Sequence, residues 1–477
     1  MQENFSAVRG PEHFRAAVDG ALADPRLKTA IDRTTGNAER KRADAIGSWP
    51  GFPAARDLGR RIKDHVVGHL DHYLEMFEQN AIASGAQVHW ARNSEEACQV
   101  VIDICRRAKA RSVTRSKSML GEEIGLPHAL EDAGITRVET DLAEHIIQLA
   151  GDPPSHIIWP AMHRTREEVA DLFRKHHHTP PNSDEAPDMV ASARRELRAK
   201  FLAADVGISG ANFLIADTGA ACVVTNEGNA ELTTTLPRVH IVTVGIEKLV
   251  PSINHAMVLL RLLVRSATGA ELTQYTTFHQ GPKRSADADG PQEFHIVLVD
   301  NGRTRMLSEG LAEMLRCIRC GACMNHCVVF RHIGGHAYGA TYPGPMGAVL
   351  TPVLEGLARS HDLPHACTLN GKCQEVCPVM IPLPTLLRGW RDRSWREGLE
   401  PRVMRTGLGL WGIVAAHPRL YRLTVSPVMS VVRLFRRGGW IARLPFAAGW
   451  TAHRDLPAPA ARNFMAQYRS KRKGEYK

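Results

Sequence analysis

Hydrophobic residues recur at helical spacing along the first hundred residues of the chain. Residues 1–65 are polar with helical periodicity, and a Pro-Gly-Phe-Pro segment at Pro50–Pro53 interrupts them. From about residue 60 to 110 the pattern is again helical, as in the runs Asp71–Phe77 and Glu95–Cys105. We therefore predict a helical N-terminal segment, residues 1–65, that leads through further helices into a larger domain.

Short β-like runs alternate with helices over the next two hundred residues. The predicted elements are helices at Gly121–Ala133, Glu144–Ala150 and Thr165–Lys175, and strands at Arg111–Arg115, Thr136–Asp141, His156–Ala161, Asn212–Asp217, Ala220–Asn226, Val239–Gly245 and His295–Asp300. Alternation at this pitch favours a parallel sheet with covering helices. We predict an α/β domain over residues 66–302. Within it, residues 176–190 are predicted to be a surface loop, and the run His176–His178 favours a solvated loop over a metal site.

From Arg305 onward the pattern is helical again. A helical face runs into a cysteine-rich segment, and a helix restarts beyond Pro384. Residues 396–477 carry short apolar runs broken by Arg, Pro and Gly. One of these runs, Gly407–Ala416, is too short to span a bilayer. We predict a helical module over residues 303–395, followed by a helical C-terminal region.

Composition and charge narrow the function classes. The chain has 477 residues, of which 44% are hydrophobic and 23% charged, which is ordinary for a globular protein. We find no apolar run of roughly 18 residues and no basic-then-apolar start, so neither a membrane span nor export is predicted. The net charge is +10, with basic clusters at Arg436–Arg437 and Arg469–Lys473. Two interpretations stay open: a surface that docks on an acidic partner or the inner membrane face, and a solvated tail. Nucleic-acid binding is not predicted, because charge is present without a recognition motif.

The cysteines carry the clearest chemistry. Seven of the ten lie within Cys317–Cys377, in two copies of one spacing. The first copy is Cys317-Ile-Arg-Cys320-Gly-Ala-Cys323-Met-Asn-His-Cys327. The second is Cys367-Thr-Leu-Asn370-Gly-Lys-Cys373-Gln-Glu-Val-Cys377, with asparagine in the second slot. This spacing is typical of the bacterial ferredoxin ligand run, in which thiolates wrap a cubane iron–sulfur cluster.

In two-cluster ferredoxins the fourth cysteine of each run ligates the other cluster. This rule assigns the ligands Cys317, Cys320, Cys323 and Cys377 to cluster 1, and Cys327, Cys367 and Cys373 to cluster 2. Asn370 stands where cluster 2 would take a fourth thiolate, and an amide oxygen is a poor ligand for thiophilic iron. We predict one 4Fe–4S cluster and a second cluster that is either 4Fe–4S or 3Fe–4S.

Disulfides and zinc explain this segment less well. Disulfides need an oxidising compartment, whereas oxygen-sensitive clusters and free thiols fit the cytoplasm. Zinc sites rarely repeat a four-cysteine spacing of this kind. The other cysteines, Cys98, Cys105 and Cys222, lie in apolar contexts and are predicted to be small buried hydrophobes.

Several long strings make the chain recognisable. They are Ser116–Met119, Val138–Leu142, Gln148–His156, Gly207–Asp217, Thr225–Asn229, Cys317–Cys327 and Gly334–His336. Through them the chain resembles the lactate utilization protein B family, also described as the L-lactate oxidation iron–sulfur protein family. The resemblance implies an N-terminal α/β lactate-utilization domain of the CoA-transferase/ribose-5-phosphate-isomerase-like type. A helical two-cluster ferredoxin domain and a family-specific C-terminal region, residues 396–477, would follow it.

One departure concerns the ligands. Members of the family often carry cysteine at the position of Asn370 and none at the position of Cys367. The ligand set that the resemblance implies therefore transfers for the other six cysteines, which are Cys317, Cys320, Cys323, Cys327, Cys373 and Cys377. For the third thiolate of cluster 2, Cys367 is our candidate.

The resemblance also implies a function. It indicates the iron–sulfur electron-transfer subunit of a cytoplasmic complex that oxidises L-lactate to pyruvate, not active alone. Its partners would be lactate utilization protein A, which resembles cysteine-rich heterodisulfide reductase subunits, and protein C, a second lactate-utilization-domain protein. Electrons would pass on to a further acceptor. We find no G-x-G-x-x-G fingerprint after a predicted strand, so a Rossmann nicotinamide or flavin site is not indicated.

The catalytic residues are not identified by the sequence. Polar candidates at the predicted strand tips are Lys117, Glu139, Asp141, His156, Asp217 and Glu227. Each suits a substrate contact, because ligand sites in open α/β sheets gather at strand ends, and each equally suits a cap or turn. Two further functions stay open: acyl transfer through Glu227, and a regulatory or scaffold role for the clusters. The sequence does not distinguish lactate from a related hydroxy acid such as glycolate as the substrate.

Overall fold

The structure is a computed structural model that describes residues 10–180, 184–445, 451 and 454–474. The chain divides into two compact units, Met1–Ser394 and Trp395–Lys477. Residues 1–9, which begin the segment predicted to be helical, lie outside the described residues. So does part of the predicted loop at 176–190.

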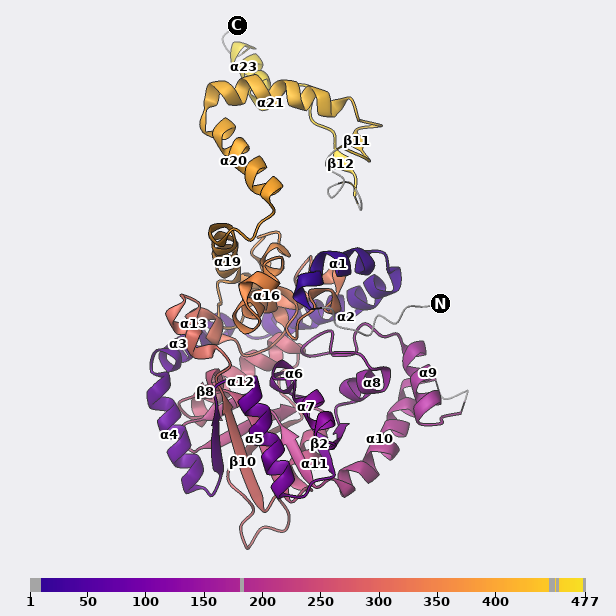
Figure 1. The fold of residues 1–477 in the computed structure, drawn as a ribbon, viewed down its shortest axis with the longest axis vertical. Helices are drawn as coiled ribbons and strands as arrows, with labels where there is room; N and C mark the ends of the chain where they lie inside the picture. The colour runs from indigo at the N-terminus through magenta and orange to yellow at the C-terminus, as the bar shows by residue number, and fades with distance from the viewer. Residues whose placement is uncertain (1–9, 181–183, 446–450, 452–453, 475–477) are drawn as a thin grey trace. The chain divides into compact units, whose positions relative to one another are not determined.

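A six-stranded parallel sheet forms the centre of the first unit (Figure 1). Its strands, in spatial order, are β1 (Gln87–Ala91), β10 (Glu293–Val299), β7 (Val239–Gly245), β4 (Val206–Ser209), β2 (Ser112–Arg115) and β3 (Thr136–Glu139). Every residue of β7 is buried, as expected of a central strand with both faces covered. The predicted parallel α/β architecture is therefore confirmed.

Helices cover both faces of this sheet and give each face its own core. The helices of this region are α4 (Leu70–Ala83), α5 (Ser94–Arg107), α6 (Met119–Glu123), α7 (Leu126–Asp132), α8 (Leu142–Ala150), α9 (Arg166–His176), α10 (Ala186–Ala203), α11 (Asn229–Thr235), α12 (Ile253–Ala267) and α13 (Arg303–Ser308). On β7, Val239 and Ile241 pack with α5 and α7, whereas Val242 and Val244 pack with α4. This alternation follows from the two-residue period of a strand.

A second, four-stranded sheet stands beside the first. Its order is β8 (Leu249–Val250), β5 (Phe213–Ile215), β6 (Ala220–Thr225) and β9 (Tyr275–His279). Strands β5 and β6 form an antiparallel hairpin, and the predicted turn residues Thr218 and Gly219 lie in the connection between them. The segment Glu227–Asn229 follows β6 and opens α11.

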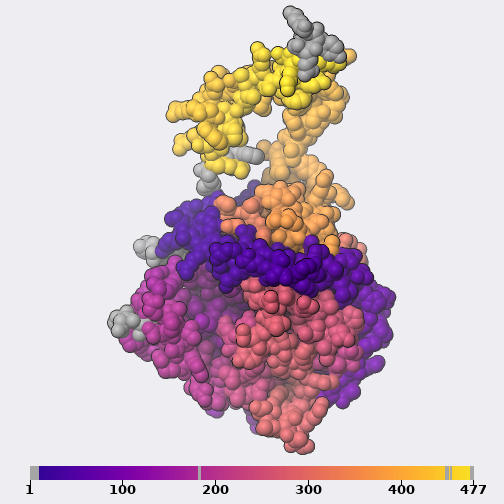
Figure 2. Space-filling model, turned by 180° about the vertical axis from the view of Figure 1, so that it is seen from behind, coloured from indigo at the N-terminus to yellow at the C-terminus, as the bar shows by residue number. Residues whose placement is uncertain are grey.

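Short helices form the cysteine-rich part of the first unit. They are η3 (Ala312–Arg316), α14 (Ala322–Asn325), α15 (Phe330–Ile333), η4 (His336–Tyr338), α16 (Gly344–Leu354), α17 (Leu357–Ser360), η5 (Leu363–His365), α18 (Lys372–Val376) and α19 (Leu383–Glu397). The first helices of the chain, α1 (Phe14–Leu22), α2 (Pro25–Gly47) and α3 (Phe52–Gly68), pack on this part rather than standing apart. In the space-filling view they lie as an indigo band across the salmon and orange surface (Figure 2).

Three predictions about individual elements were wrong. The segment His156–Ala161 is not a strand, because the amides of Ile158 and Trp159 donate to His156 Nδ1 and so leave no regular ladder. Residues 87–91, placed in a helical stretch, form the edge strand β1. Helix α10 begins at Ala186, inside the predicted loop, because proline in the first turn starts a helix as readily as it breaks one.

The second unit is helical, as predicted. It contains α20 (Arg402–Ala416), α21 (Pro418–Arg433) and α23 (Phe464–Gly474), with two short strands β11 (Trp440–Ile441) and β12 (Leu456–Pro457). Helices α20 and α21 contact each other, and the rings of Trp411 and Tyr421 lie 5.9 Å apart. Neither helix has a buried residue. Across the described residues, we find no helix with the length and apolar character needed to cross a membrane.

Candidate iron–sulfur centre and adjoining pocket

The two cysteine runs fold into matching loops. Arg319 in the first run and Leu369 in the second both have positive φ, 59° and 57°. Two residues later, Gly321 and Gly371 have φ of 73° and 81° and precede α14 and α18. The second run therefore keeps the backbone of the first even though Asn370 replaces a cysteine.

The structure brings Cys317, Cys320, Cys323 and Cys377 together, here called the first thiol group. Burial raises the pKa of Cys320 to about 12, and the neighbouring Cys377 and Cys317 add to the rise. Burial also raises the pKa of Cys323 well above its ordinary value, with further contributions from Cys320, Cys317 and Cys377. These are the four cysteines that the crossover rule assigns to cluster 1, although their ligation stays a prediction.

Cys327, Cys367 and Cys373 form the second thiol group. Burial raises the pKa of Cys373 to about 12, and Cys367 and Cys327 add to it. Asn370 lies in the same loop, but its Oδ1 accepts a hydrogen bond from the Lys372 amide at 3.0 Å. The equivalent amide in the first run, that of Ala322, donates to Cys320. Asn370 thus reproduces the local hydrogen bond of a cysteine without supplying a thiolate.

Both thiol groups fit an iron–sulfur cluster. Backbone amides donate to the sulfurs, as Leu369 does to Cys367 at 3.2 Å and Ile381 to Cys377 at 3.4 Å. Such bonds stabilise cluster thiolates, and iron would relieve the repulsion among them. Within the described part of the chain, no three His, Cys, Asp or Glu side chains converge tightly enough to hold one metal ion.

Cations from the rest of the unit surround the first thiol group. Arg42 and Arg56 come from the N-terminal helices, and Arg56 Nε donates to the Cys377 carbonyl at 2.7 Å. Burial lowers the pKa of Lys63 to about 8, and its ammonium bonds the Glu247 and Leu249 carbonyls. These positive charges oppose the negative charge of clustered thiolates, so the N-terminal helices are part of the centre.

A buried tyrosine lies near cysteines of both thiol groups. Tyr338 is fully enclosed, and its hydroxyl has no hydrogen-bond partner among the described residues. Burial raises its pKa well above the ordinary value, and Cys327, Cys367 and Cys323 raise it further. Its surroundings therefore include cysteines of both groups.

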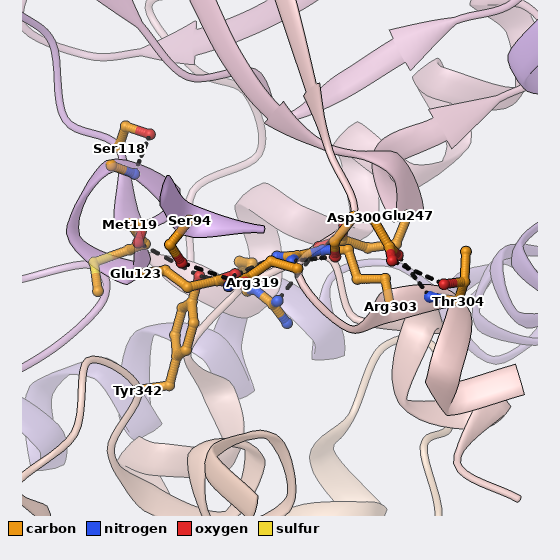
Figure 3. A network of polar contacts seen from close by, with 12 residues as sticks. Ser94, Ser118, Met119, Glu123, Glu247, Asp300, Arg303, Thr304, Arg319 and Tyr342 are labelled. Atoms are coloured by element: carbon orange, nitrogen blue, oxygen red, sulfur yellow. Dashed lines mark hydrogen bonds and ion pairs between the residues drawn. The ribbon is translucent and has the colours of Figure 1, made fainter. Parts of the chain in front are cut away.

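A buried polar network joins the cysteine-rich part to the parallel sheet (Figure 3). Arg303 binds Glu247 at 2.5 Å and Glu123 at 2.8 Å. Arg319 reaches Glu247 at 3.3 Å, and the Tyr342 hydroxyl donates to Glu123 at 2.7 Å. Burial alone would raise the pKa of Glu247, but Arg303, Arg319 and a neighbouring lysine lower it to about 2. The carboxylates stay charged and hold the two parts in register.

A cavity of about 350 Å³ opens at the carboxyl ends of β2, β4 and β7. The chain runs from β2 to β3 on one side and from β4 to β7 on the other. Ligand sites in open α/β sheets lie where the connections diverge in this way. Arg319 and Lys248 belong to the lining, and both lie near Cys317. The cavity therefore adjoins the first thiol group.

The six predicted polar candidates divide into two sets. Lys117, Asp141 and Glu227 line the cavity. Glu139 is buried away from it and pairs with Arg115 at 2.7 Å.

The other two candidates also lie outside the cavity. His156 is buried against Asn325 at 3.2 Å, and burial lowers its pKa to about 3. Asp217 is exposed at the β5–β6 turn. Neither residue is among those that line the cavity.

Sequence reasoning missed four charged residues of the site. Lys248 and Glu247 follow β7 directly, a place where strand-end residues are expected to face ligand. Arg303 and Arg319 carried no such signal, because their role depends on how the cysteine-rich part docks on the sheet.

The remaining predicted cysteines and histidines lie apart from both thiol groups. Cys105 and Cys222 are buried as predicted, and burial raises the pKa of each to about 12. Cys98 is half-buried and donates to the Ile124 carbonyl. His177 is half-buried on Phe173 rather than fully solvated.

Two protein-family models agree with this architecture. A family model described as the LUD domain matches residues 74–299, and a 4Fe-4S dicluster domain model matches residues 313–381. The chain is 39% identical to "Uncharacterized electron transport protein YkgF" of Escherichia coli K12, over 97% of this chain and 98% of that protein. It is 41% identical to "Lactate utilization protein B" of Bacillus thuringiensis strain Al Hakam, over 91% of each. A crystal structure of a DUF162 family protein from Deinococcus radiodurans covers 48% of this chain at 13% identity, with a TM-score of 0.28.

Proposed function

Because this chain belongs to the lactate utilization protein B family, we propose that it is the iron–sulfur electron-transfer subunit of a cytoplasmic complex oxidising L-lactate to pyruvate. The observation that carries the proposal is the pair of adjoining thiol groups in a dicluster domain. Cys373 of the second group is close enough to Cys323 of the first to raise the pKa of Cys323. Clusters held there would exchange electrons over a short distance.

The chain's own residues would support such a relay. The first group would bind one cluster, and the second group would bind another through three thiolates. Each cluster supplies one-electron chemistry when bound. Arg42, Arg56 and Lys63 favour the additional negative charge of a reduced cluster. The partners in the proposed complex are lactate utilization proteins A and C.

An anaerobic preparation tests the proposal. Iron and sulfide are quantified, and EPR spectra are recorded after L-lactate is added to the chain alone and to the chain with proteins A and C. We expect reduced-cluster signals only in the mixture. Cys320→Ser should lose iron and the signals, whereas Cys98→Ser should keep both. Zinc without sulfide would overturn the proposal, as would clusters that lactate never reduces in the mixture.

Acyl transfer through Glu227 is less well supported. Burial raises the pKa of Glu227, and the neighbouring Asp141 raises it further. Both effects disfavour the ionised carboxylate, which is the form that attacks an acyl group. Its position in the cavity suits hydrogen bonding to a ligand better than attack on an acyl group.

We also propose that the second unit docks on an anionic lipid surface. Between Glu400 and Asp455 the sequence has nine arginines and no aspartate or glutamate. Helices α20 and α21 expose large apolar side chains among them, including Trp411 at 50% and Leu423 at 73%. Basic helices with exposed aromatic and aliphatic residues bind at the headgroup boundary of anionic bilayers.

Vesicle sedimentation tests this docking. We expect the full chain to bind phosphatidylglycerol vesicles, to release in high salt and to ignore phosphatidylcholine vesicles. Changing Arg433, Arg436 and Arg437 to glutamine should weaken binding, at about 1 kcal/mol per arginine. The same change at Arg92, Arg106 and Arg107 should not. Equal binding to both vesicle types would contradict the proposal, and binding to an acidic protein instead would assign the surface to that partner.

A further inference from the structure

Among the described residues that line the cavity beside the first thiol group, one cation has no hydrogen bond or ion pair. Arg303 and Arg319, which also line it, are both paired with Glu247. Lys117 donates to the Ile158 carbonyl. By contrast, the structure shows no hydrogen bond or ion pair to the Lys248 ammonium among the described residues, although Glu247 and Cys317 lie near enough to favour its charge.

Lys248 is half-buried and is one of the residues that line the cavity. Burial lowers its pKa to about 8, and Arg319 lowers it further, against the influence of Glu247 and Cys317. A half-buried ammonium that forms no hydrogen bond within the protein gains from a ligand that supplies a counter-charge. The ammonium is therefore placed to receive an anion.

The other polar groups of the cavity limit which anion fits. Asp141 and Glu227 share the lining, and the Asp141 carboxylate repels a multiply charged ligand such as phosphate. They accept hydrogen bonds well from a hydroxyl. The volume of about 350 Å³ is at the small end of ligand pockets. A singly charged acid that also carries a hydroxyl group satisfies all three conditions.

We propose that the cavity at the carboxyl ends of β2, β4 and β7 binds a small 2-hydroxy carboxylate, with its carboxylate on Lys248, beside the first thiol group. This inference deepens the proposed function and rests on it for the choice among organic acids. The neighbourhood of Cys317 links the two sites. An anion on Lys248 cancels positive charge near a cluster held there, so binding should lower that cluster's midpoint potential.

Isothermal titration of the iron-loaded full chain, without proteins A and C, tests the inference. The probes are L-lactate, glycolate, the uncharged L-lactamide and inorganic phosphate. We expect both acids to bind and lactamide and phosphate to bind much more weakly. Lys248→Met should weaken lactate binding at least about tenfold, because a charge-assisted bond is lost. Lys248→Arg should retain most of the affinity. Lys283→Met should match the wild type, because Lys283 is exposed and does not line the cavity.

A second measurement covers the case in which Lys248→Met does not fold. An EPR-monitored redox titration of the wild type, with and without L-lactate, should show a lower potential for one cluster in its presence. Lactamide should cause no shift.

Three outcomes would overturn the inference: lactate binding that is unchanged in Lys248→Met, lactamide binding as tight as lactate, or tighter binding of phosphate. These measurements need no turnover, so they separate a failure of this site from a failure of the electron-transfer role. A chain that binds lactate but is never reduced in the complex would contradict only the latter.

Discussion

Asn370 is the residue at which this chain departs most informatively from its own internal repeat. It holds the place of Cys320 and makes the same backbone hydrogen bond through oxygen. Cys367, three residues earlier, is the thiol that joins Cys327 and Cys373. We expect Asn370→Cys to complete the second group, raising iron toward eight per chain and removing any three-iron EPR signal.

The matched variant is Cys367→Ser, which should lose the second cluster while the first is retained. Iron and sulfide are quantified in both variants, and their EPR spectra are recorded. Full cluster content in Cys367→Ser would show that Cys367 is not a ligand.

Tyr338 is a second residue with a measurable role. Its unpartnered hydroxyl lies near Cys327, Cys367 and Cys323. A hydroxyl that donates to cluster sulfur favours the reduced state. A bond that strengthens by about 1 kcal/mol on reduction raises a one-electron potential by about 40 mV. Tyr338→Phe, which keeps the ring, should lower one midpoint potential by that order in an EPR-monitored redox titration.

Tyr73→Phe serves as the control, because that hydroxyl bonds His65 at the surface. An unchanged potential in Tyr338→Phe would mean that the hydroxyl does not reach the sulfur.

Individual residues differ in how far the sequence revealed them. The two thiol groups could be predicted, because ligand spacing along one chain segment limits which thiols can meet. Lys117 and Glu227 could be named as strand-tip candidates, and both line the cavity. Lys248 follows β7 and could have been named on the same ground. Arg319 could not, because its importance depends on which charges around it are paired in the folded chain.

At the scale of elements, the loops of the two runs differ in what surrounds them. Both Gly321 and Gly371 have positive φ, where any other residue costs about 1–2 kcal/mol. A Cβ at Gly321 would also lie 3.1 Å from Ile158 and 3.2 Å from His156. A Cβ at Gly371 would have no neighbouring atom within 4 Å. We expect Gly371→Ala to lower the unfolding free energy by about 1 kcal/mol and Gly321→Ala to lower it more.

Thermal unfolding of the iron-loaded chain gives the comparison, with iron content measured on the same samples. If the two variants lost equal unfolding free energy, the side chains of Ile158 and His156 would have to move aside for the new Cβ at little cost.

Element prediction succeeded where a single period dominated. The buried strand β7 and the helix α5 are long enough for their patterns to be unambiguous. The edge strand β1 has only five residues between two helices. A hydrophobicity pattern averaged over the length of a helix is therefore dominated by the neighbouring helices. His156–Ala161 has strand-like composition, but its backbone is satisfied by the His156 side chain, which no local pattern indicates.

At the scale of the whole molecule, buried histidines link the docking of the two parts to pH. His156 contacts Asn325, and the ring of His336 bonds the Pro153 carbonyl at 2.8 Å. Burial lowers the pKa of His156 to about 3 and that of His336 to about 4. Both residues lie where the α/β part meets the cysteine-rich part.

The sign of the pH dependence follows from these values. An unfolded histidine titrates near pH 6.5, so below that pH the unfolded chain binds protons that the folded chain does not. The contribution to stability is complete above pH 6.5 and is lost as the pH falls toward about 4 for His336. At pH 5.5 each such histidine should cost about 1 kcal/mol. We expect the unfolding temperature to fall between pH 7.5 and 5.5, and to fall less in His336→Asn. His128→Asn is the control, because that ring is 85% exposed. A fall as steep in His336→Asn as in the wild type would place the acid sensitivity elsewhere, and the visible absorbance of the same samples would show whether cluster loss accounts for it.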